Sequence, residues 1–571
     1  MSVGASHSRF FAKAPSNNPP RPAWVSECPG PGPDAAVGSS ASGKATAEGY
    51  RPPWNPGTGI GSSFSNPTPP RQARPREAST TMAPGCMVDG RTGTMSIPSR
   101  SKSLVIGAVV LLLATAAILL RSRSRRPPAG RPDIVLIVWD TCRADRISAL
   151  GYPKPTTPRL DALAAEGVRF TACFAPAPWT GPSHASLFTG VLPHRHGYEE
   201  KLGGTVRPDI PLLAETLRAA GYETVGFTAN AMVSSLTGLD RGFEEFHAVY
   251  ENDAGDPPGD RALRKVRDWL ASRTPRGPGD RPLFFFFNMM DTHVNVSALP
   301  EDIAVVRDPA VSDRALRQAA KTSHQEAMAL LLGLGTVDEE TFAGISTRYD
   351  ASVRFVDRRT GEILDLLEGR GLLGNSLVAV TSDHGENLGD HGLLDHRASV
   401  HDTLLHVPLV IRAPGRFEGG RTVARQVSLM DLHPTLLKAA GVKSPPGTGL
   451  DALPLDHGEG PGRVLTASEE PTGGFVLMLK ESFPGATEKD FAPLYRGFVA
   501  ARDPAGAVRP RKYIRVENRR GDVPVVLKEE LFDIASDPGE TRNLLEGTPD
   551  PADREAAERL RRAIEDARKP R

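Results

Sequence analysis

Polar side chains that can bind a metal ion follow three predicted strands. Carboxylates favour Mg, Ca or Mn, and an imidazole shifts the preference toward Zn or Mn. In open α/β sheets, ligands bind beyond the carboxyl ends of the strands, where distant segments meet. Each such residue alone is more often a cap or a hydrogen-bonded polar group, but together they predict one divalent-cation site. The residues at strand ends are Asp140 after IVLIVW, Asp291 and His293 after LFFFF (283–287), and Asp383 and His384 at the end of LVAVTSDHG (377–385). Of these, Asp140, Asp383 and His384 are the predicted metal ligands.

The stretch WTGPSHASLFTG (179–190) raises the question of a nucleophile. Thr180 precedes Gly-Pro, and proline is common in the first turn of a helix, so we expect a helix over Pro182–Phe188. Thr180 is then either an ordinary N-cap or a hydroxyl at the positive helix end beside the cation, where an alkoxide and an anionic substrate are favoured. A threonine hydroxyl is too weak a nucleophile at its free pKa, so the second interpretation needs the metal.

Strands and amphipathic helices alternate along the folded part of the chain. Helical periodicity is clear in IPLLAETLRAAG (210–221) and in the stretch 350–371, and further apolar strands are predicted at 283–287, 377–385 and 407–412. This alternation predicts an α/β fold with a mostly parallel central sheet flanked by helices. From about 445 the chain has more loops and fewer aliphatic residues and ends in a charged helix from about 551, which predicts a smaller C-terminal subdomain.

The N-terminal part has a different composition. Residues 1–94 are rich in Pro, Gly, Ser and Ala and are predicted to be disordered. Met95 is an alternative start, which would make 1–94 a mis-annotated extension. The uncharged apolar run 104–120 predicts a membrane-spanning signal-anchor within 95–127. The net charge of +1 gives no reason to expect a nucleic-acid partner.

The chain resembles the sulfatase branch of the alkaline phosphatase superfamily over about 131–545. The motifs stand in family order and cover most of the folded chain. They are IVLIVWDTCRAD, PTTPRLDALAAEGVRFTACFAPAPWTGPSHASLFTG, LPHRHG, GLDRGFEEF, MMDTH, VAVTSDHGENLGDHG, HVPLVIRAPG and ELFDIASDPGETRNL. The resemblance implies an alkaline-phosphatase-like fold, with the catalytic domain at 130–444 and its C-terminal subdomain at 445–571.

The resemblance also implies roles for single residues. Asp140, Asp383 and His384 would bind the metal, and Thr180, itself a ligand, would occupy the position of the nucleophile. His293 would contact the transferred group or protonate the leaving oxygen. His396 falls where many members carry a group-binding lysine and is the second candidate for the proton donor. The remaining predicted site residues are Asn230 and His184 for substrate binding, and His391 beside the metal ligands.

Four departures from the family pattern are informative. TGPSH replaces the Cys- or Ser-x-Pro-Ser-Arg motif, so no formylglycine is expected. Thr141 replaces a second aspartate, His384 replaces the asparagine of an Asp-Asn-Gly motif, and FTAN (227–230) replaces a Gly-Lys-Trp-His stretch. Each change moves away from calcium and sulfate and toward the threonine-using phosphodiesterases, phosphonate hydrolases and phosphoglycerol or phosphoethanolamine transferases of the superfamily.

We therefore predict a metal-dependent hydrolase or transferase of sulfate or phosphate esters. It would use Thr180, a covalent intermediate and one divalent cation (Mn, Zn or Ca), or two, with a preference for phosphate mono- or diesters. The alternative is a catalytically inactive, membrane-tethered binding protein on the same fold. The expected location is a membrane anchor through 104–120 with the catalytic domain outside the cytoplasm, although the four arginines at 121–126 favour the opposite orientation.

Overall fold

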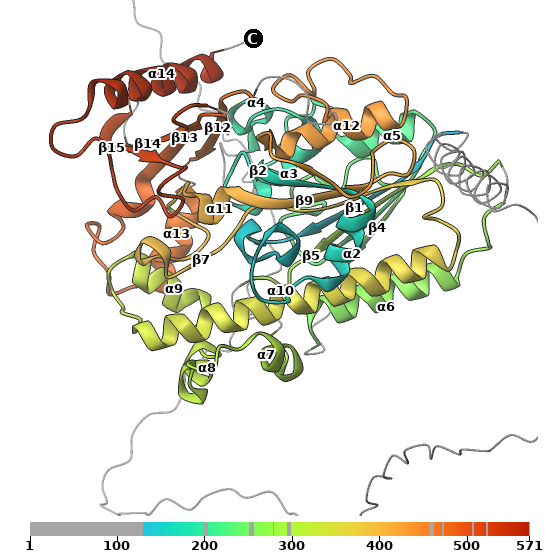
Figure 1. The fold of residues 1–571 in the computed structure, drawn as a ribbon, viewed down its shortest axis with the longest axis horizontal. Coiled ribbons are helices and arrows are strands. Elements are labelled where there is room, and N and C mark those ends of the chain that lie inside the picture. The colour runs from blue at the N-terminus through green and yellow to red at the C-terminus, as the bar shows by residue number, and fades with distance from the viewer. Residues whose placement is uncertain are drawn as a thin grey trace, which may run out of the picture. The chain divides into compact units, whose positions relative to one another are not determined.

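The central element of the fold is a nine-stranded sheet with the order β10-β2-β9-β6-β1-β5-β3-β4, with β11 pairing with β2. The computed structural model describes residues 130–569 except 199–203, 251–255, 278, 294–297, 456–461, 471–472, 505–506 and 521–523. Strand β9 (His406–Arg412) runs antiparallel to both of its neighbours, and the other pairings are parallel. The predicted α/β fold with a mostly parallel sheet is confirmed (Figure 1).

Strand β1 (Asp133–Trp139) lies at the centre of this sheet. Its segment DIVLIVW is a nearly continuous apolar run, as expected of a parallel strand covered on both faces. Because successive side chains point to opposite faces, Ile134, Leu136 and Val138 join one hydrophobic core and Val135, Ile137 and Trp139 join the other. The sheet is therefore the middle layer between two cores.

Helices cover both faces of the sheet. The core that contains Val135 also takes side chains from α2 (Pro158–Glu166), α6 (Pro258–Ala271) and α10 (Glu339–Glu368). The core that contains Leu136 takes them from α3 (Thr180–Thr189), α5 (Leu213–Ala219) and α12 (Leu432–Ala439). Figure 1 shows α6 and α10 on one side of the sheet and α5 and α12 on the other. The helix predicted at 350–371 begins earlier, at Glu339, where the side chain of Asp338 caps it.

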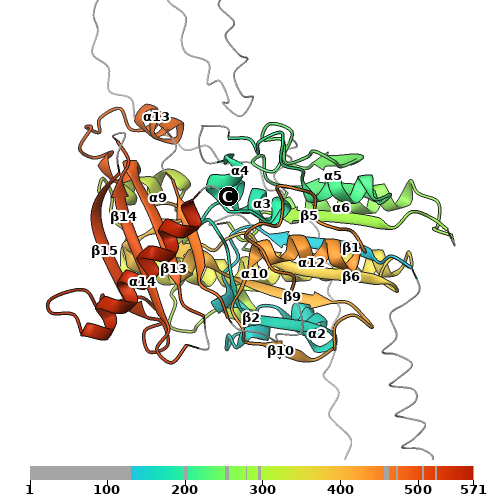
Figure 2. The same cartoon turned by 90° about the horizontal axis from the view of Figure 1, so that it is seen from above.

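A second, smaller sheet follows in the C-terminal part. It is antiparallel, with the order β12 (Leu465–Glu469), β13 (Arg496–Arg502), β14 (Arg511–Asn518) and β15 (Val525–Asp533). Helix α14 (Pro551–Arg568) packs on it through Leu560 and Ile564, which join Tyr513 and Leu531 in a separate core. Figure 2 shows α14 lying across this sheet. The smaller C-terminal subdomain is thus confirmed.

The remaining elements connect these layers. The strands are β2 (Val168–Phe174), β3 (Glu223–Thr228), β4 (Glu245–Ala248), β5 (Leu283–Met289), β6 (Ser376–Ser382), β7 (Asn387–Leu388), β8 (Leu394–Asp395), β10 (Arg421–Val423) and β11 (Val427–Ser428). The helices are α4 (Pro193–His196), α7 (Pro300–Val306), α8 (Asp313–Ala319), α9 (His324–Leu331), α11 (Asp402–Leu405) and α13 (Gly473–Ser482).

The predictions for the N-terminal part fall outside the described residues. This applies to the disordered segment 1–94, to the signal-anchor within 95–127 and to its apolar run 104–120. In the part of the chain that the structure describes, no helix is both long and apolar enough to span a bilayer. This finding contradicts the predicted location, a membrane-anchored protein with its catalytic domain outside the cytoplasm, and that prediction is withdrawn.

Candidate active site

Strand register brings the predicted metal ligands together. In β1, Trp139 pairs with Met289 of β5 on one side and with Ser382 of β6 on the other. Asp140 and Asp383, the next residue of each strand, therefore leave the same edge of the sheet side by side. The backbone N–H of Asp140 still donates to the carbonyl of Met289 at 2.7 Å, which holds the turn against β5.

Asp140, Asp383 and His384 form a fully buried group whose ligand atoms all lie within 4.8 Å of one another. The Nε2 atom of His384 is 3.3 Å from Asp383 Oδ2 and 3.8 Å from Asp140 Oδ1. The Nδ1 atom of His384 lies 2.9 Å from the carbonyl oxygen of Gly385. A carbonyl can only accept, so Nδ1 carries the proton and the Nε2 lone pair faces the two carboxylates, as in a metal-binding histidine.

The carboxylate of Asp383 divides its two oxygens between the backbone and this group. Oδ1 accepts the backbone N–H groups of Thr141 at 3.2 Å and His384 at 2.9 Å. Oδ2 accepts no hydrogen bond from the backbone and faces the imidazoles of His184 and His384, each at 3.3 Å. One oxygen of a rigidly held carboxylate thus points toward Asp140 and His384, which is the arrangement that a cation requires.

Burial, repulsion between the two carboxylates and attraction to the imidazoles shift the pKa values of these groups. Burial, and then the charge of Asp383, raise the pKa of Asp140. Burial also raises the pKa of Asp383, but the charges of His384 and His184 and the hydrogen bond from His184 outweigh it and lower that pKa below its usual range. Burial lowers the pKa of His384 to about 4, so its imidazole is neutral at pH 7. Two buried carboxylates beside a neutral imidazole are a donor set that fits a divalent cation.

Thr180 is the first residue of α3, and Trp179 takes the N-cap position. The predicted alternative in which Thr180 itself caps the helix is therefore wrong. Its Oγ1 atom lies 3.4 Å from Asp140 Oδ1 and 3.4 Å from His384 Nε2. The hydroxyl stands at the helix N-terminus, where the unpaired backbone N–H groups favour negative charge.

Gly181 lets α3 start in this position. A Cβ atom at residue 181 would lie only 2.1 Å from Cε1 and 2.5 Å from the hydroxyl oxygen of Tyr198. Tyr198 is itself fully buried, and its ring meets Trp179 edge-on with the ring centroids 5.8 Å apart. The glycine of the TGPSH motif is therefore needed for the close approach of an aromatic ring to the helix start.

Replacement of Gly181 with alanine is expected to lower the free energy of unfolding by about 1–3 kcal/mol, because the added methyl group forces Tyr198 or the helix start to move. The displaced helix start should also lower kcat. Denaturant titration and steady-state kinetics check both effects. Gly374→Ala is the control, since a Cβ at residue 374 meets nothing within 4 Å. Equal behaviour of the two variants would show that the Tyr198 contact is unimportant.

Asn230 lies just after β3 and reaches the same group. Its Oδ1 accepts the backbone N–H of Met232 at 2.8 Å, which fixes the orientation of the amide. Its Nδ2 then donates to Asp140 Oδ2 at 2.7 Å and lies 3.3 Å from Thr180 Oγ1. Asn230 is therefore adjacent to the candidate nucleophile, in keeping with its predicted place at the substrate.

His184, one turn along α3, lies beneath the group. Its ring is fully buried and contacts Phe188 and Phe286 edge-on, with centroid distances of 6.1 Å and 6.2 Å. Nδ1 donates to the carbonyl oxygen of Thr180 at 3.1 Å and faces Asp383 Oδ2. This geometry favours a role in holding Asp383 and the helix start over the predicted contact with substrate.

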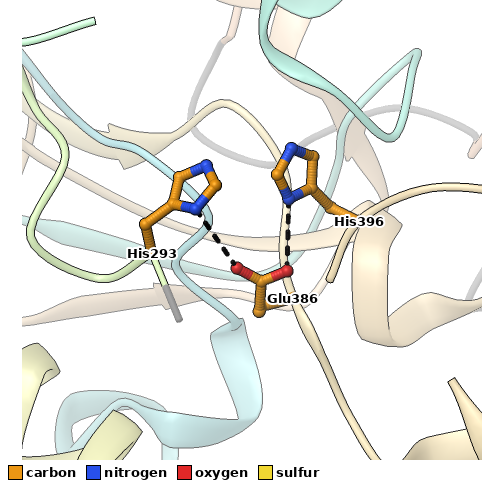
Figure 3. A group of neighbouring side chains, drawn as sticks. All are labelled: His293, Glu386 and His396. Atoms are coloured by element: carbon orange, nitrogen blue, oxygen red, sulfur yellow. Dashed lines mark hydrogen bonds and ion pairs between the residues drawn. The ribbon is translucent and has the colours of Figure 1, made fainter. Parts of the chain in front are cut away.

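His293 and His396 face each other across Glu386 (Figure 3). His293 Nδ1 is 3.9 Å from Glu386 Oε2, and His396 Nδ1 is 3.2 Å from Glu386 Oε1. The ring of His396 lies 4.7 Å from that of His293 and 4.6 Å from that of His384. His396 therefore lies beside the predicted metal ligand His384, and His293 lies beside His396. The side chains of His293 and His396 are 19% and 12% exposed, respectively.

The two histidines have opposite electrostatic surroundings. Burial and the charge of His396 lower the pKa of His293 to about 3. Burial also lowers the pKa of His396, but Asp395 and Glu386 outweigh it and raise that pKa well above its usual range. His396 Nδ1 lies 2.8 Å from Asp395 Oδ1 as well as close to Glu386. Of the two histidines, His396 is thus the better candidate for a positively charged side chain or a proton donor.

Two neighbouring carboxylates were not assigned a role from the sequence. Glu386 directly follows His384-Gly385 and is fully buried between the two histidines. Asp395 is buried beside His396. The signal that could have drawn attention to both is their position, since one follows the metal pair within two residues and the other directly precedes His396.

Among the residues that the structure describes, two further groups of side chains have metal-ligand types. One is His293, Glu386 and His396. Carboxylates only accept, so the Nδ1 atom of His396 between two of them carries a proton and is not a free ligand. The cation is therefore better placed at Asp140, Asp383 and His384 than here.

The other group is His391, His401 and Glu540. His391 was predicted beside the metal ligands. Instead it stacks on His401 with the ring centroids 3.7 Å apart. Both histidines line a cleft of about 1210 Å³ that is also lined by Arg496, Phe498 and other residues of the C-terminal sheet. The structure thus does not bring His391 to Asp140, Asp383 and His384.

The fold is that of the alkaline-phosphatase-like hydrolases. The phosphonate monoester hydrolase of Agrobacterium radiobacter has the same fold, with a TM-score of 0.58 at 23% identity over 77% of this chain and 95% of that one. The chain belongs to the sulfatase family, whose sequence model matches residues 132–442. It is 28% identical to the N-acetylgalactosamine-6-sulfatase of Mus musculus over 61% of this chain and 69% of that protein. It is 26% identical to the choline-sulfatase of Rhizobium meliloti over 74% and 84%, respectively.

Family membership confirms the resemblance seen in the sequence and supports a hydrolase. It does not support the predicted transfer reaction, the phosphodiesterase activity or the alternative of an inactive binding protein. Two of the relatives are named as sulfatases and one as a phosphonate monoester hydrolase, and an ester substrate for this chain agrees with these names.

Proposed function

We propose that this chain hydrolyses sulfate or phosphate esters through Thr180, with a preference for phosphate. The observation that carries the proposal is the position of the Thr180 hydroxyl, 3.4 Å from both Asp140 Oδ1 and His384 Nε2 at a helix N-terminus. No other hydroxyl of the described residues contacts both of these atoms. The family's nucleophile position also falls on Thr180.

Asp140, Asp383 and His384 would hold a divalent cation, with Thr180 as the fourth ligand. When bound, the cation supplies Lewis acidity that lowers the pKa of a hydroxyl and polarises a non-bridging oxygen of the ester. The chain's own contribution is to fix these buried side chains in place. The amide of Asn230, held by Met232, can donate to an oxygen of the transferred group or of Thr180.

The reaction proceeds in two displacements. Thr180 Oγ1 gives its proton to water and forms a bond to phosphorus or sulfur while the bond to the leaving oxygen breaks, which leaves a phospho- or sulfo-threonine. His396 or His293 gives a proton to the leaving oxygen. Water then attacks the same phosphorus or sulfur atom, releases phosphate or sulfate and restores the threonine hydroxyl. A histidine that has lost its proton can regain it from this water.

The residues at the candidate site favour a phosphate ester as the substrate, whereas the names of the relatives favour a sulfate ester. Thr180 cannot form formylglycine, and His384 and Thr141 stand where calcium-binding sulfatases carry an asparagine and an aspartate. The relatives that are named as sulfatases instead indicate a sulfate ester. The residues at the reacting centre decide the chemistry more directly than overall similarity does.

We expect kcat/KM for an aryl phosphate monoester or diester to exceed that for the matching aryl sulfate by at least about tenfold, a difference of roughly 1.4 kcal/mol in transition-state stabilisation. The pairs must share the same phenol, so that the leaving group is identical. Turnover of the sulfate with no detectable turnover of either phosphate would refute the preference while leaving the hydrolase assignment intact.

A further inference from the structure

A short hairpin next to the active site holds Asp395 in an unusual conformation. Strands β7 and β8 pair through Asn387 and Asp395, and the side-chain amide of Asn387 donates to the carbonyl oxygen of Asp395 at 2.9 Å. The side chain of Asn387 is in turn held by the hydroxyl of Thr403 at 2.8 Å. Asp395 has a φ of 68°, in the left-handed region that few residues with a Cβ adopt. Such conformations persist where the surroundings enforce them, and they concentrate at functional sites.

The carboxylate of Asp395 connects two histidines. Oδ1 lies 2.8 Å from His396 Nδ1 and also accepts the backbone N–H of His396 at 2.7 Å. Oδ2 lies 2.5 Å from Nδ1 of His324, the first residue of α9. Asp395 is only 4% exposed, so its contact with His396 is shielded from water, whereas the His324 side chain on its other side is half-exposed. A buried carboxylate with both oxygens engaged is a fixed point against which an imidazole can be oriented.

The second carboxylate, Glu386, contacts the same nitrogen of His396 from another side, at 3.2 Å. With Nδ1 committed to Asp395 and Glu386, only Nε2 of His396 is available to a substrate. The ring lies beside that of His384, whose Nε2 is 3.4 Å from the Thr180 hydroxyl. The orientation of the ring therefore decides whether Nε2 can meet the group that Thr180 attacks.

We propose that Asp395 is a positioning residue that holds His396 by Nδ1 and so presents Nε2–H to the leaving oxygen. The inference rests on the proposed function and chooses between its two candidate proton donors. In the step concerned, the bond from phosphorus or sulfur to the leaving oxygen breaks, and its electron pair takes the proton from Nε2. His396 is left neutral, and the water that hydrolyses the phospho- or sulfo-threonine returns a proton. His324 steadies Asp395 from outside the site.

The kinetic test uses the full chain and a series of aryl phosphates whose leaving phenols range from acidic to weakly acidic. Asp395→Asn keeps the shape of the side chain, and Asp395→Gly suits the positive φ, so at least one variant should fold. We expect a loss in kcat of about 10²-fold for the poorest leaving group and less than about threefold for the best, with KM little changed, because good leaving groups need no proton. The control is Asp302→Asn on α7. Asp302 is 3% exposed and ion-paired to Arg358 at 2.7 Å, and its replacement should leave both rates unchanged.

A uniform loss across the series, or no loss, would overturn the inference. His396→Gln should show the same leaving-group dependence, and the double variant with Asp395→Asn should lose no more than either alone. Thr180→Ala tests the proposed function separately from the role of Asp395. If the proposed function is wrong, this variant should keep the wild-type rates for every leaving group.

A spectroscopic test does not depend on activity. In protein labelled with 15N-histidine, the Nδ1–H of His396 between two carboxylates should give a low-field proton resonance, in the wild type and in Thr180→Ala alike. The resonance should be absent from His396→Gln, which assigns it, and should be lost or shifted upfield in Asp395→Gly. An unchanged resonance in Asp395→Gly would show that Asp395 does not hold the ring.

Discussion

Replacement of Thr180 with alanine is expected to lower kcat by about 10³–10⁶-fold, the range seen when a covalent nucleophile is removed from a preformed site. The expectation follows from the position of the Thr180 hydroxyl between Asp140 and His384. The variant should fold normally, because the residue contributes one small side chain at the start of α3. Steady-state kinetics on an aryl phosphate measure the loss.

Two control variants make this result specific. Thr180→Ser retains a hydroxyl and should keep much of the activity, whereas Thr189→Ala removes a hydroxyl from the other end of the same helix. Thr189 is equally buried, and its hydroxyl only donates to the carbonyl oxygen of Ala185 at 2.7 Å. Wild-type activity in Thr180→Ala would remove the basis of the proposed mechanism. Trapping with a rapid quench should further show labelled phosphate on the wild-type chain and none on Thr180→Ala.

Removal of divalent cations is expected to lower kcat/KM by about 10²–10⁴-fold, since a Lewis acid contributes several kcal/mol to the stabilisation of the transition state. Dialysis against a chelator followed by titration with Mn, Zn or Ca tests this, and the cation that restores activity at the lowest concentration identifies the preferred metal. Retention of full activity after thorough chelation would contradict the metal site.

The Asp383→Asn variant locates the site. It preserves the size of the side chain but removes the charge of the oxygen that faces His384 and His184. We expect it to lose activity like the chelated enzyme and to lose the rise in Tm that the cation causes in the wild type through preferential binding to the folded state. The matched control is Asp350→Asn, which changes an equally buried carboxylate that is paired with Arg146 and Lys154. It should lower Tm without abolishing the response to the cation.

Local patterns in the sequence determined the fold class. The apolar run of β1 predicts a strand covered on both faces, and its alternate side chains do enter two cores. The position of Asp140 and Asp383 directly after two such strands sufficed to predict that they meet, because parallel neighbours end at the same edge of a sheet. Thr180 stood out for a similar reason, since Gly-Pro after a polar residue is a helix-start signal with local physical causes.

Other features depend on contacts between segments far apart in the chain, which no local pattern encodes. The burial of Glu386 between His293 and His396, and the contact of Asp395 with His324, join residues from separate loops and helices. The edge-on contacts of His184 with Phe188 and Phe286 depend on how α3 packs on β5. His391 is close in sequence to the metal ligands, but the hairpin turns it toward His401. Residue types and strand ends were thus readable from the chain itself, whereas the direction in which each side chain points was settled only by tertiary packing, because that direction depends on neighbours contributed by distant segments.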